Sequence, residues 1–398
     1  MQLRQRFPFF LSVGLVTEGF FLLLAWLLSE PSGVFPGVQV AGRTIGGSSF
    51  QEVLLECRKI AQQKEEQPIV LMANGKRLVV KPKELGVHFF PERAAAKAWM
   101  AGREFSLWAR LRSRWLARRG LSVPMPVRVE KPQLQRVLQN LKKPPRNATV
   151  ALIRGKVHLI PEQKGWSVDL DGAIEKLVDG LSNGQSFFFL PLRPEVPTIT
   201  SRELLRVTSL RAQVIVTMTS RHPNAYHNAQ LAAQAIDKAV VFPKQVLSLN
   251  ELIGRRTKER GFLPAPVLIN ERRDLGLGGG ICPVATAVFL AAAQAGMDIV
   301  ERHPHTRLVR YAQPGLDATL NFPNKDLKIR NPTREPMVLR VQIKSGRILV
   351  QVFGVPKEGE IKLITKNQRF GNYLQVTTER LKYGHREFLC RSLYRRID

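Results

Sequence analysis

The stretch of the chain that most constrains its fold is LGLGGGICPVATAVFLAAAQAG, residues 275–296. A glycine-rich turn is followed by a lone cysteine, a proline and a run of small apolar residues. Proline is favoured at the first position of a helix, because its missing N–H would be unpaired there, and a glycine commonly ends a helix. The pattern predicts a helix that begins at or next to Cys282 and ends at Gly296. Because it is apolar on nearly every side, this helix should be buried.

The cysteine of this stretch is a candidate nucleophile. A thiol at the start of a buried helix lies at the positive end of the helix dipole, which lowers its pKa and favours the thiolate. The preceding Gly278, Gly279 and Gly280 would let a substrate backbone approach closely. Two interpretations remain open: Cys282 is catalytic, or it is a small core residue behind a tight glycine turn.

Residues that could complete a thiol site follow Cys282 in the chain. They are His303, His305 and Asp317, with a predicted strand, 308–311, between them. A Cys at a helix start, a later His and an Asp that orients the His form the arrangement of papain-like and transglutaminase-like enzymes. We expect His305 or His303 to act as the base and Asp317 to orient it. Ordinary polar turns would explain the same three residues.

A charged loop, RRTKER at 255–260, precedes the glycine turn. Its Arg256 and Glu259 are candidate substrate-binding residues, because an arginine can hold a peptide carboxylate; a solvated turn has the same composition. Nothing matches the paired Cys and His spacing of a structural zinc site. The glycine run also lacks the partners of a phosphate-binding motif. We therefore expect neither a metal nor a cofactor.

The charge balance points to an anionic partner. The chain has 61 Lys and Arg against 32 Asp and Glu, a net charge of +29 over 398 residues, and such an excess favours an anionic polymer or surface. No zinc-finger, homeodomain or RNA-recognition pattern is present, so we do not expect nucleic acid. Three cysteines do not imply a disulfide framework. Cys57 lies on the apolar face of a predicted helix and is expected in a core.

Residues 1–30 are predicted to be a membrane anchor. Arg4 and Arg6 precede a mostly apolar run, 7–28, which is long enough for the roughly 20 residues of a bilayer span. Positive charge on the N-terminal side predicts that this side is cytoplasmic. Glu18 weakens the span. Because no clean A-x-A cleavage site follows, an uncleaved single-pass anchor is favoured over a removed signal peptide, with the bulk of the chain extracytoplasmic.

Residues 31–200 contain an internal repeat. The segments 69–99 and 149–181 align, with Gly75-Lys76 matching Gly155-Lys156. Each copy predicts a hairpin and then a helix, and a further helix precedes each copy, at 50–62 and 131–141. The first of these helices should begin at a capping box, Ser49-Phe50-Gln51-Glu52, and the first hairpin should turn at Asn74-Gly75. The sequence therefore predicts two related α+β units, which either present a binding surface or serve as a stalk.

Between the two copies lies REFSLWARLRSRWLARR, residues 103–119, in which six arginines alternate with apolar and aromatic residues. As a helix it would be basic and amphipathic, with Trp108 and Trp115 on one face. It is suited to anionic lipid or to an anionic polymer, although an ordinary solvated helix is the alternative.

A third domain is expected at 201–355, after a proline-rich linker. It should contain a strand at 213–218, a helix at 226–240 and a hairpin formed by 337–343 and 348–353. Residues 356–398 read as a basic tail with two or three strands and no identifiable site.

Residues 246–322, which include the glycine turn and the histidine segment, resemble the VanW family of exported bacterial proteins, named from a vancomycin-resistance cluster. The preceding repeats resemble the peptidoglycan-binding domain that often comes before a VanW domain. The family pattern Cys-Gln-x-Ser-[Thr/Ser] stands here as Cys282-Pro283-Val284-Ala285-Thr286, so Gln and Ser are replaced by Pro283 and Ala285. The resemblance implies a cell-wall context, with peptidoglycan or anionic wall polymers as partners.

Together these observations predict an α+β protein with an N-terminal anchor, tandem repeats and a VanW domain built around the cysteine helix. The expected function is that of a membrane-anchored, extracytoplasmic Cys-dependent peptidase, amidase or transpeptidase acting on peptidoglycan. The alternative is a non-catalytic protein that binds peptidoglycan or another wall polymer and affects glycopeptide sensitivity.

Overall fold

The structure is a computed structural model that describes residues 25, 26, 29, 31–269 and 272–395. Contacts divide the chain into two compact units. Unit 1 comprises Met1–Pro145 and Lys164–Val196, and unit 2 comprises Arg146–Gln163 and Pro197–Asp398, each within the described ranges. The predicted membrane anchor, residues 1–30, lies outside the described residues except for 25, 26 and 29. None of the helices in the described part of the chain has the length and apolar character needed to cross a membrane.

Unit 1 is a set of small sheets and short helices around one core. Its helices are α2 (Phe50–Glu66), η1 (Pro82–Leu85), α3 (Pro91–Met100), α4 (Leu107–Arg118), α5 (Lys131–Leu138), η2 (Gln139–Leu141) and α6 (Leu170–Ser182). Its strands are β1 (Val38–Val40), β2 (Arg43–Thr44), β3 (Ile69–Ala73), β4 (Lys76–Val80), β5 (Val87–Phe89), β6 (Leu121–Val123), β7 (Val127–Val129), β10 (Gly165–Val168), β11 (Phe187–Phe189) and β12 (Leu192–Glu195).

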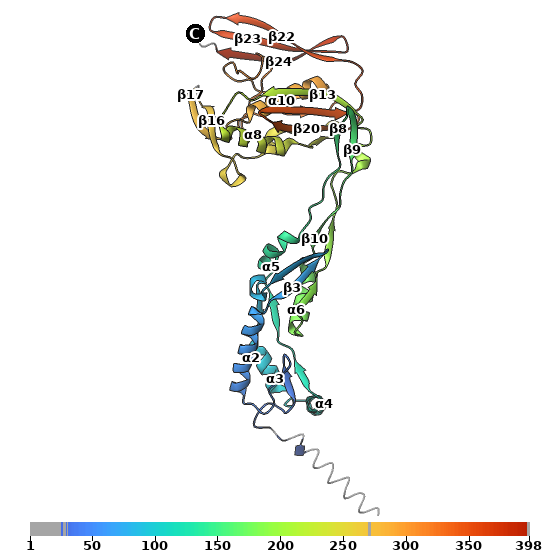
Figure 1. Cartoon of the computed structure of the whole chain (residues 1–398), viewed down its shortest axis with the longest axis vertical. Helices are drawn as coiled ribbons and strands as arrows, with labels where there is room; N and C mark the ends of the chain where they lie inside the picture. The colour runs from blue at the N-terminus through green and yellow to red at the C-terminus, as the bar shows by residue number, and fades with distance from the viewer. Residues whose placement is uncertain (1–24, 27–28, 30, 270–271, 396–398) are drawn as a thin grey trace, which may run out of the picture. The chain divides into compact units, whose positions relative to one another are not determined.

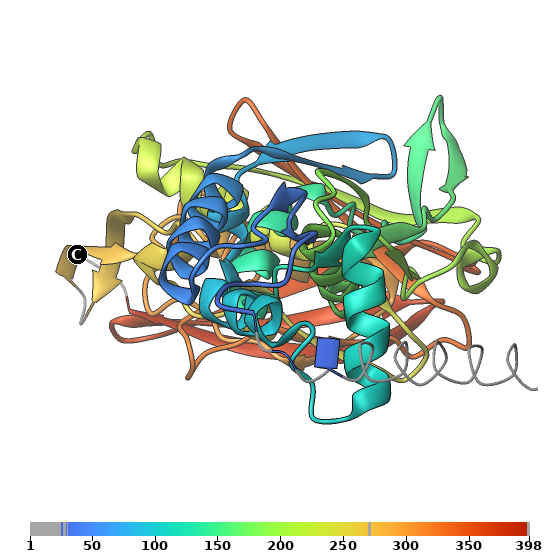
Figure 2. The same ribbon diagram turned by 90° about the horizontal axis from the view of Figure 1, so that it is seen from below.

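Several local predictions for unit 1 are confirmed. Ser49 and Glu52 form the capping box that starts α2, and α2 packs on α3, as Figures 1 and 2 show in two views. Cys57 is fully buried in the core. Parallel pairing of β11 with β3 joins segments more than a hundred residues apart, which the sequence did not indicate.

The repeat is visible as a shared order of elements. The first copy runs β3, β4, β5, α3, and the second runs β8 (Thr149–Ile153), β9 (Lys156–Ile160), β10, α6. Both hairpins turn on two residues with positive φ, Asn74-Gly75 and Arg154-Gly155, as a tight two-residue turn between twisted strands requires. The hairpin β8–β9 belongs to unit 2, whereas β10 and α6 belong to unit 1.

Unit 2 contains the remaining elements. Its helices are α7 (Ser201–Leu204), α8 (Pro223–Ile236), α9 (Leu249–Ile253), η3 (Lys258–Arg260) and α10 (Cys282–Ala295). Its strands after β9 are β13 (Ser209–Thr217), β14 (Val240–Val241), β15 (Val246–Ser248), β16 (Pro264–Ile269), β17 (Arg272–Leu277), β18 (Asp298–Glu301), β19 (Lys328–Arg330), β20 (Met337–Lys344), β21 (Arg347–Gly354), β22 (Ile361–Phe370), β23 (Tyr373–Lys382) and β24 (His385–Arg395).

Helix α10 is the centre of unit 2. It packs on β13 and β21 of an antiparallel sheet with the order β13-β21-β20-β14, and it also contacts α8 and β22. Nearly every side chain of α10 is buried, as its apolar sequence predicts. The buried Arg211 donates from Nε to the carbonyl of Ala295 at 2.9 Å, so a cation neutralises the negative end of the helix.

The C-terminal residues are a structural part of unit 2. Strands β22, β23 and β24 form a three-stranded antiparallel sheet in sequence order, drawn in red in Figure 1. Leu389 and Cys390 of β24 pack against the core that contains α10. The residues predicted to be a basic tail therefore cover part of the cysteine helix.

Two sequence predictions about unit 2 need correction. Residues 308–311 form no strand; the chain from 302 to 318 is irregular. The helix expected at 226–240 is α8, which begins at Pro223 and ends at Ile236. It begins earlier because Pro223 takes a position in the first helical turn, where proline is favoured. The mixed α+β class is confirmed, but the histidine segment is a loop and not the strand that a papain-like arrangement supplies.

Candidate functional site

The candidate nucleophile lies where the sequence predicted it. Cys282 is the first residue of α10, with Ile281 at the N-cap and Gly296 at the C-cap in the left-handed region, φ 84°. Cys282 is half-buried and carries a free thiol. Its position at the positive end of a buried helix favours the thiolate.

The glycine turn before Cys282 is required by close packing. Gly280 has φ +99°, and a Cβ there would lie 2.3 Å from the carbonyl oxygen of Ala225 at the start of α8. A Cβ on Gly279 would lie 2.6 Å from the carbonyl of Pro266, and one on Gly278 would meet the side chain of Arg256. At these three glycines, the atoms in close contact therefore belong to other parts of the chain.

A buried asparagine that the sequence analysis missed holds this turn. Asn228 of α8 donates from Nδ2 to the carbonyls of Leu263 and Gly279, at 2.8 and 3.0 Å, and accepts from the Leu263 amide. Its amide group thus ties α8 to the segment that leads into α10.

The structure brings His305 and Asp317 together. Nδ1 of His305 lies 2.6 Å from Oδ2 of Asp317, and the backbone N–H of His305 donates to the same oxygen at 2.7 Å. Nε2 is therefore the ring atom that faces other partners, and the Tyr311 hydroxyl lies 3.3 Å from it. A carboxylate that holds Nδ1 fixes both the tautomer and the ring orientation of a histidine.

Asp317 is itself held by buried donors. Arg302 donates to Oδ1 at 3.0 Å, and both side chains are 1% exposed. The Tyr394 hydroxyl of β24 also donates to Oδ1. Arg302 additionally binds Ser392 of β24 and the carbonyl of Asp317, each at 2.6 Å. A buried carboxylate with this many donors stays ionised, because each donor stabilises the charged form.

Two threonines connect α10 to the loop that carries Asp317. The Thr286 hydroxyl donates to the carbonyl of Ala318 at 3.1 Å and accepts from its amide at 2.9 Å. The Thr319 hydroxyl lies 3.4 Å from Sγ of Cys282. Thr286 matches the last position of the VanW family pattern. Pro283 and Ala285, the two departures from that pattern, are buried in α10.

Cys282 and His305 shift each other's pKa. Burial by itself would raise the pKa of the Cys282 thiol, but a hydrogen bond with His305, the charge of that ring and the contact with Thr319 lower the pKa to about 7. Burial would lower the pKa of His305, but its bonds to Asp317 and Cys282 raise the pKa to about 9. Between these two values the stable form is a thiolate–imidazolium pair.

The pKa shifts of the surrounding groups agree with this charge arrangement. Burial would raise the pKa of the Asp317 carboxyl, but His305, Tyr394 and Arg302 hold it below its usual value. The pKa of the Tyr311 hydroxyl is raised, by burial and then by the charges of Cys282 and Asp317. Tyr311 is therefore a neutral hydrogen-bonding group beside His305.

The remaining predicted site residues are His303, Arg256 and Glu259. Nε2 of His303 lies 2.9 Å from Oε1 of Glu301, so of the two histidines it is His305 that pairs with Asp317. Arg256 is half-buried, binds Asn250 at 2.7 Å and is close enough to Cys282 for the thiolate charge to act on its pKa. Glu259 is exposed on η3.

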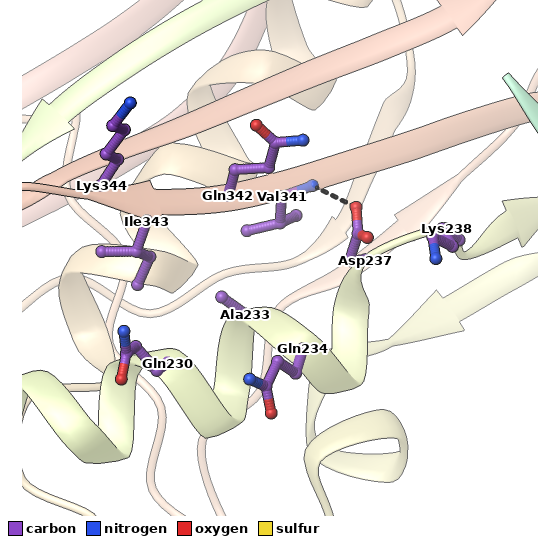
Figure 3. A pocket seen from close by; sticks show the side chains of 9 residues that line it. All are labelled: Gln230, Ala233, Gln234, Asp237, Lys238, Val341, Gln342, Ile343 and Lys344. Atoms are coloured by element: carbon purple, nitrogen blue, oxygen red, sulfur yellow. Dashed lines mark hydrogen bonds between the residues drawn. The ribbon is translucent and has the colours of Figure 1, made fainter. Parts of the chain in front are cut away.

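Two surface depressions among the described residues lie away from Cys282. One, of about 590 Å³, lies between α8 and β20 and is lined by residues such as Gln230, Gln234 and Ile343; Figure 3 shows Asp237 there accepting a hydrogen bond from the Val341 amide. None of its lining residues belongs to the Cys282 site. Across the part of the chain that the structure describes, no three His, Cys, Asp or Glu side chains are grouped to hold a metal ion.

Six residues of the site could not be identified from the sequence: Arg302, Tyr311, Thr286, Tyr394, Asn228 and Thr319. Strand alternation carried one signal, because Cys390, Ser392 and Tyr394 fall on one face of β24 and the latter two are buried. No local pattern shows that this face packs on Asp317.

Comparisons with known proteins agree with the domain order. Residues 224–353 match the family described as "VanW like protein", and residues 78–189 match the family described as "Putative peptidoglycan binding domain". No solved structure matches the chain significantly.

Two curated proteins are similar to the chain. The protein named "Uncharacterized protein YoaR", from Bacillus subtilis (strain 168), is 30% identical over 205 residues, which are 51% of this chain and 68% of that protein. The "Vancomycin B-type resistance protein VanW" of Enterococcus faecalis (strain ATCC 700802 / V583) is 23% identical over 186 residues, 43% of this chain and 67% of that protein. With its VanW-like domain after a peptidoglycan-binding domain, the chain belongs to the VanW family of cell-wall-related proteins.

Proposed function

We propose that the chain is an extracytoplasmic thiol enzyme that transfers or hydrolyses acyl groups of peptidoglycan peptides, with Cys282 as nucleophile. The observation that carries the proposal is the pairing of Nδ1 of His305 with the buried Asp317, next to a helix-start thiol whose pKa is lowered to about 7. This combination gives a charged nucleophile and a proton donor at neutral pH.

In the first step, the Cys282 thiolate attacks the carbonyl carbon of an amide bond in a wall peptide. An S–C bond forms, and the carbonyl electron pair moves onto oxygen. The His305 imidazolium then gives its Nε2 proton to the amide nitrogen, the C–N bond breaks and a free amine leaves. Asp317 stabilises the imidazolium and holds the ring in position throughout.

The second step releases the acyl group from the thioester. Neutral His305 accepts a proton from water or from a second amine while that nucleophile attacks the thioester carbon. The C–S bond breaks, and the thiolate–imidazolium pair is restored. Attack by water makes the protein a peptidase or amidase, and attack by an amine makes it a transpeptidase.

Nearby groups can serve the oxyanion and the substrate. At the start of α10 the amides of Val284 and Ala285 donate to the carbonyl of Ile281, and Pro283 has no N–H, so we assign the Cys282 N–H as the oxyanion donor. Arg256, whose charge is near the thiol, is suited to hold a peptide carboxylate.

The cellular setting is inferred from the family and from the sequence. A peptidoglycan-binding domain at 78–189 supports a location at the cell wall. The apolar run at 7–28, with Arg4 and Arg6 before it, supports a single-pass anchor whose C-terminal side is outside. The net charge of +29 also suits binding to an anionic wall polymer.

The test uses the full chain, a Cys282→Ala variant and a Cys57→Ala control, which removes a buried thiol of unit 1. Each protein is incubated with purified sacculi and with soluble muropeptides, and products are identified by mass spectrometry. We expect new products with the full chain and the control and none with Cys282→Ala; the product masses identify the bond.

The alternative function is a wall-binding protein whose cysteine is structural. It is favoured by the replacement of the family's Gln and Ser with Pro283 and Ala285 and by the peptidoglycan-binding match. If no protein gives products while all three sediment with sacculi, the enzyme proposal is wrong and this alternative is supported.

A further inference from the structure

Helix α4 carries a surface that the proposed chemistry does not use. Trp108, Arg112, Trp115 and Arg119 are all exposed, and their spacing of four, three and four residues places them on one face of the helix. Trp108 is 80% exposed and Trp115 50% exposed. Exposed tryptophans in a row mark an interaction surface more often than chance.

The opposite face of α4 is held in place by a buried arginine, Arg114. Arg114 is 1% exposed, donates to the carbonyl of Gly102 at 3.0 Å and donates to the carbonyls of Trp26 and Ser29. Its guanidinium also lies 5.2 Å from the Trp26 ring. The predicted amphipathic helix is therefore confirmed, but one of its arginines is a structural residue and not part of the basic surface.

These contacts place α4 next to residues at the end of the apolar N-terminal run. Trp26 lies within the apolar sequence 7–28 and Ser29 follows it, and both bind Arg114. Figure 1 shows α4 at one end of unit 1. A helix that binds Trp26 and Ser29 lies close to any bilayer that the apolar sequence before them enters.

The chemistry of the exposed face suits a lipid interface. Tryptophan rings prefer the headgroup level of a membrane, where the ring is apolar and its N–H stays wet. Arg119 lies 3.9 Å over the Trp115 ring, so charge and ring form one unit. Phe105, fully exposed just before α4, extends the apolar area, and the segment 103–119 has six arginines against one glutamate.

We propose that the face of Trp108, Arg112, Trp115 and Arg119 lies on the outer surface of an anionic phospholipid bilayer. The rings enter the headgroup region and the arginines pair with lipid phosphates. The aromatic residues favour lipid over an anionic wall polymer, because a hydrated polymer offers no apolar phase for the rings. The proposal does not depend on the chemistry of Cys282.

The test measures tryptophan emission of the full chain reconstituted into vesicles. Vesicles contain phosphatidylcholine alone or with phosphatidylglycerol, and brominated phosphatidylglycerol serves as a contact quencher. Subtracting the spectrum of a Trp108→Phe/Trp115→Phe variant from that of the unsubstituted chain gives the emission of the two exposed rings. Subtracting the spectrum of a Trp166→Phe variant in the same way gives the emission of Trp166, a half-buried ring of the same unit, which serves as the control.

We expect the emission of Trp108 and Trp115 to shift to the blue and to be quenched only when anionic lipid is present, while that of Trp166 is unchanged. An Arg112→Gln/Arg119→Gln variant should lose this quenching, since each arginine near an anionic surface strengthens binding by about fivefold. Lys97→Gln/Arg136→Gln, which removes equal charge from α3 and α5, should retain it.

Equal quenching of the two difference spectra, or quenching independent of headgroup charge, would overturn the proposal. The same holds if the full chain fails to associate with anionic vesicles. If Arg112→Gln/Arg119→Gln instead weakens sedimentation with sacculi and the rings remain unquenched, the face binds wall polymer. All substituted side chains except Trp166 are exposed, and circular dichroism checks that each variant is folded.

Discussion

The hydroxyl of Tyr394 donates a hydrogen bond to Oδ1 of Asp317, and both side chains are buried at about 1% exposure. The contact joins the last strand of the chain to the carboxylate that orients His305. Tyr394 also accepts from the Gly315 amide at 2.7 Å. The C-terminal sheet is therefore part of the candidate site and not an appendage to it.

Replacing Tyr394 with Phe should weaken both stability and thiol reactivity. The change leaves Asp317 without one donor, which should lower the free energy of unfolding by about 1–3 kcal/mol. The pKa of His305 should move as Asp317 is repositioned, and alkylation of Cys282 at neutral pH should slow. Denaturant unfolding and iodoacetamide kinetics measure the two effects. Tyr373→Phe, on a half-exposed ring of the same sheet, is the matched control and should change neither.

The reactivity of Cys282 should follow the pKa values of the pair. The thiolate forms as pH rises through about 7, so the alkylation rate should climb there and then level off. Turnover should fall again as pH rises through about 9, because His305 then loses the proton that it gives to the leaving amine. The pKa of Cys57 is raised to about 11 by burial and nearby carboxylates. Alkylation of Cys282 that begins only above pH 8 would contradict the thiolate–imidazolium pair.

Asp317→Asn should be strongly destabilising. It leaves the buried Arg302 guanidinium without its counter-charge, and breaking a buried pair in this way costs about 3–5 kcal/mol. Asp298→Asn removes the partner of Arg330 in a pair that is 31% and 51% exposed. It should cost less than about 1 kcal/mol. Urea unfolding of both variants tests the difference. Equal losses in the free energy of unfolding would show that the buried Arg302 does not depend on the charge of Asp317.

Thr286→Val should loosen the loop that carries Asp317. Valine has the same shape but leaves the buried amide and carbonyl of Ala318 without the hydroxyl, at a cost of about 1–3 kcal/mol. Thr286→Ser keeps both hydrogen bonds and should retain Cys282 reactivity. If the valine and serine variants alkylate equally fast, the contact between Thr286 and Ala318 does not position the site.

Gly280→Ala should perturb the start of α10. Its Cβ would lie 2.3 Å from the carbonyl oxygen of Ala225, so the turn or α8 must shift. Gly346→Ala is a suitable control, because that glycine also has positive φ but has open space around its Cβ position. It should cost only the backbone penalty of about 1–2 kcal/mol. Thermal unfolding should show a clearly larger loss for Gly280→Ala, and equal losses would mean that the contact with Ala225 is not tight.

Short-range patterns in the sequence determined the local elements of this protein. Pro283 and Gly296 set the start and end of α10, and its apolar composition set its burial. Ser49 with Glu52 set the start of α2, and Asn74-Gly75 with Arg154-Gly155 set two hairpins. These predictions held because caps and turns depend on a few neighbouring residues. The strand expected at 308–311 was wrong, since the chain is irregular there and alternation alone does not supply a partner strand.

The tertiary structure alone decided which groups meet. The sequence listed Cys282, His303, His305 and Asp317 in order but could not separate the two histidines. The choice of His305 depends on Asp317, which depends in turn on Arg302 and on Tyr394 from a strand 77 residues away. Such contacts are made between elements whose packing is set by burial of whole faces. The spacing of residues along the chain does not indicate how those faces pack.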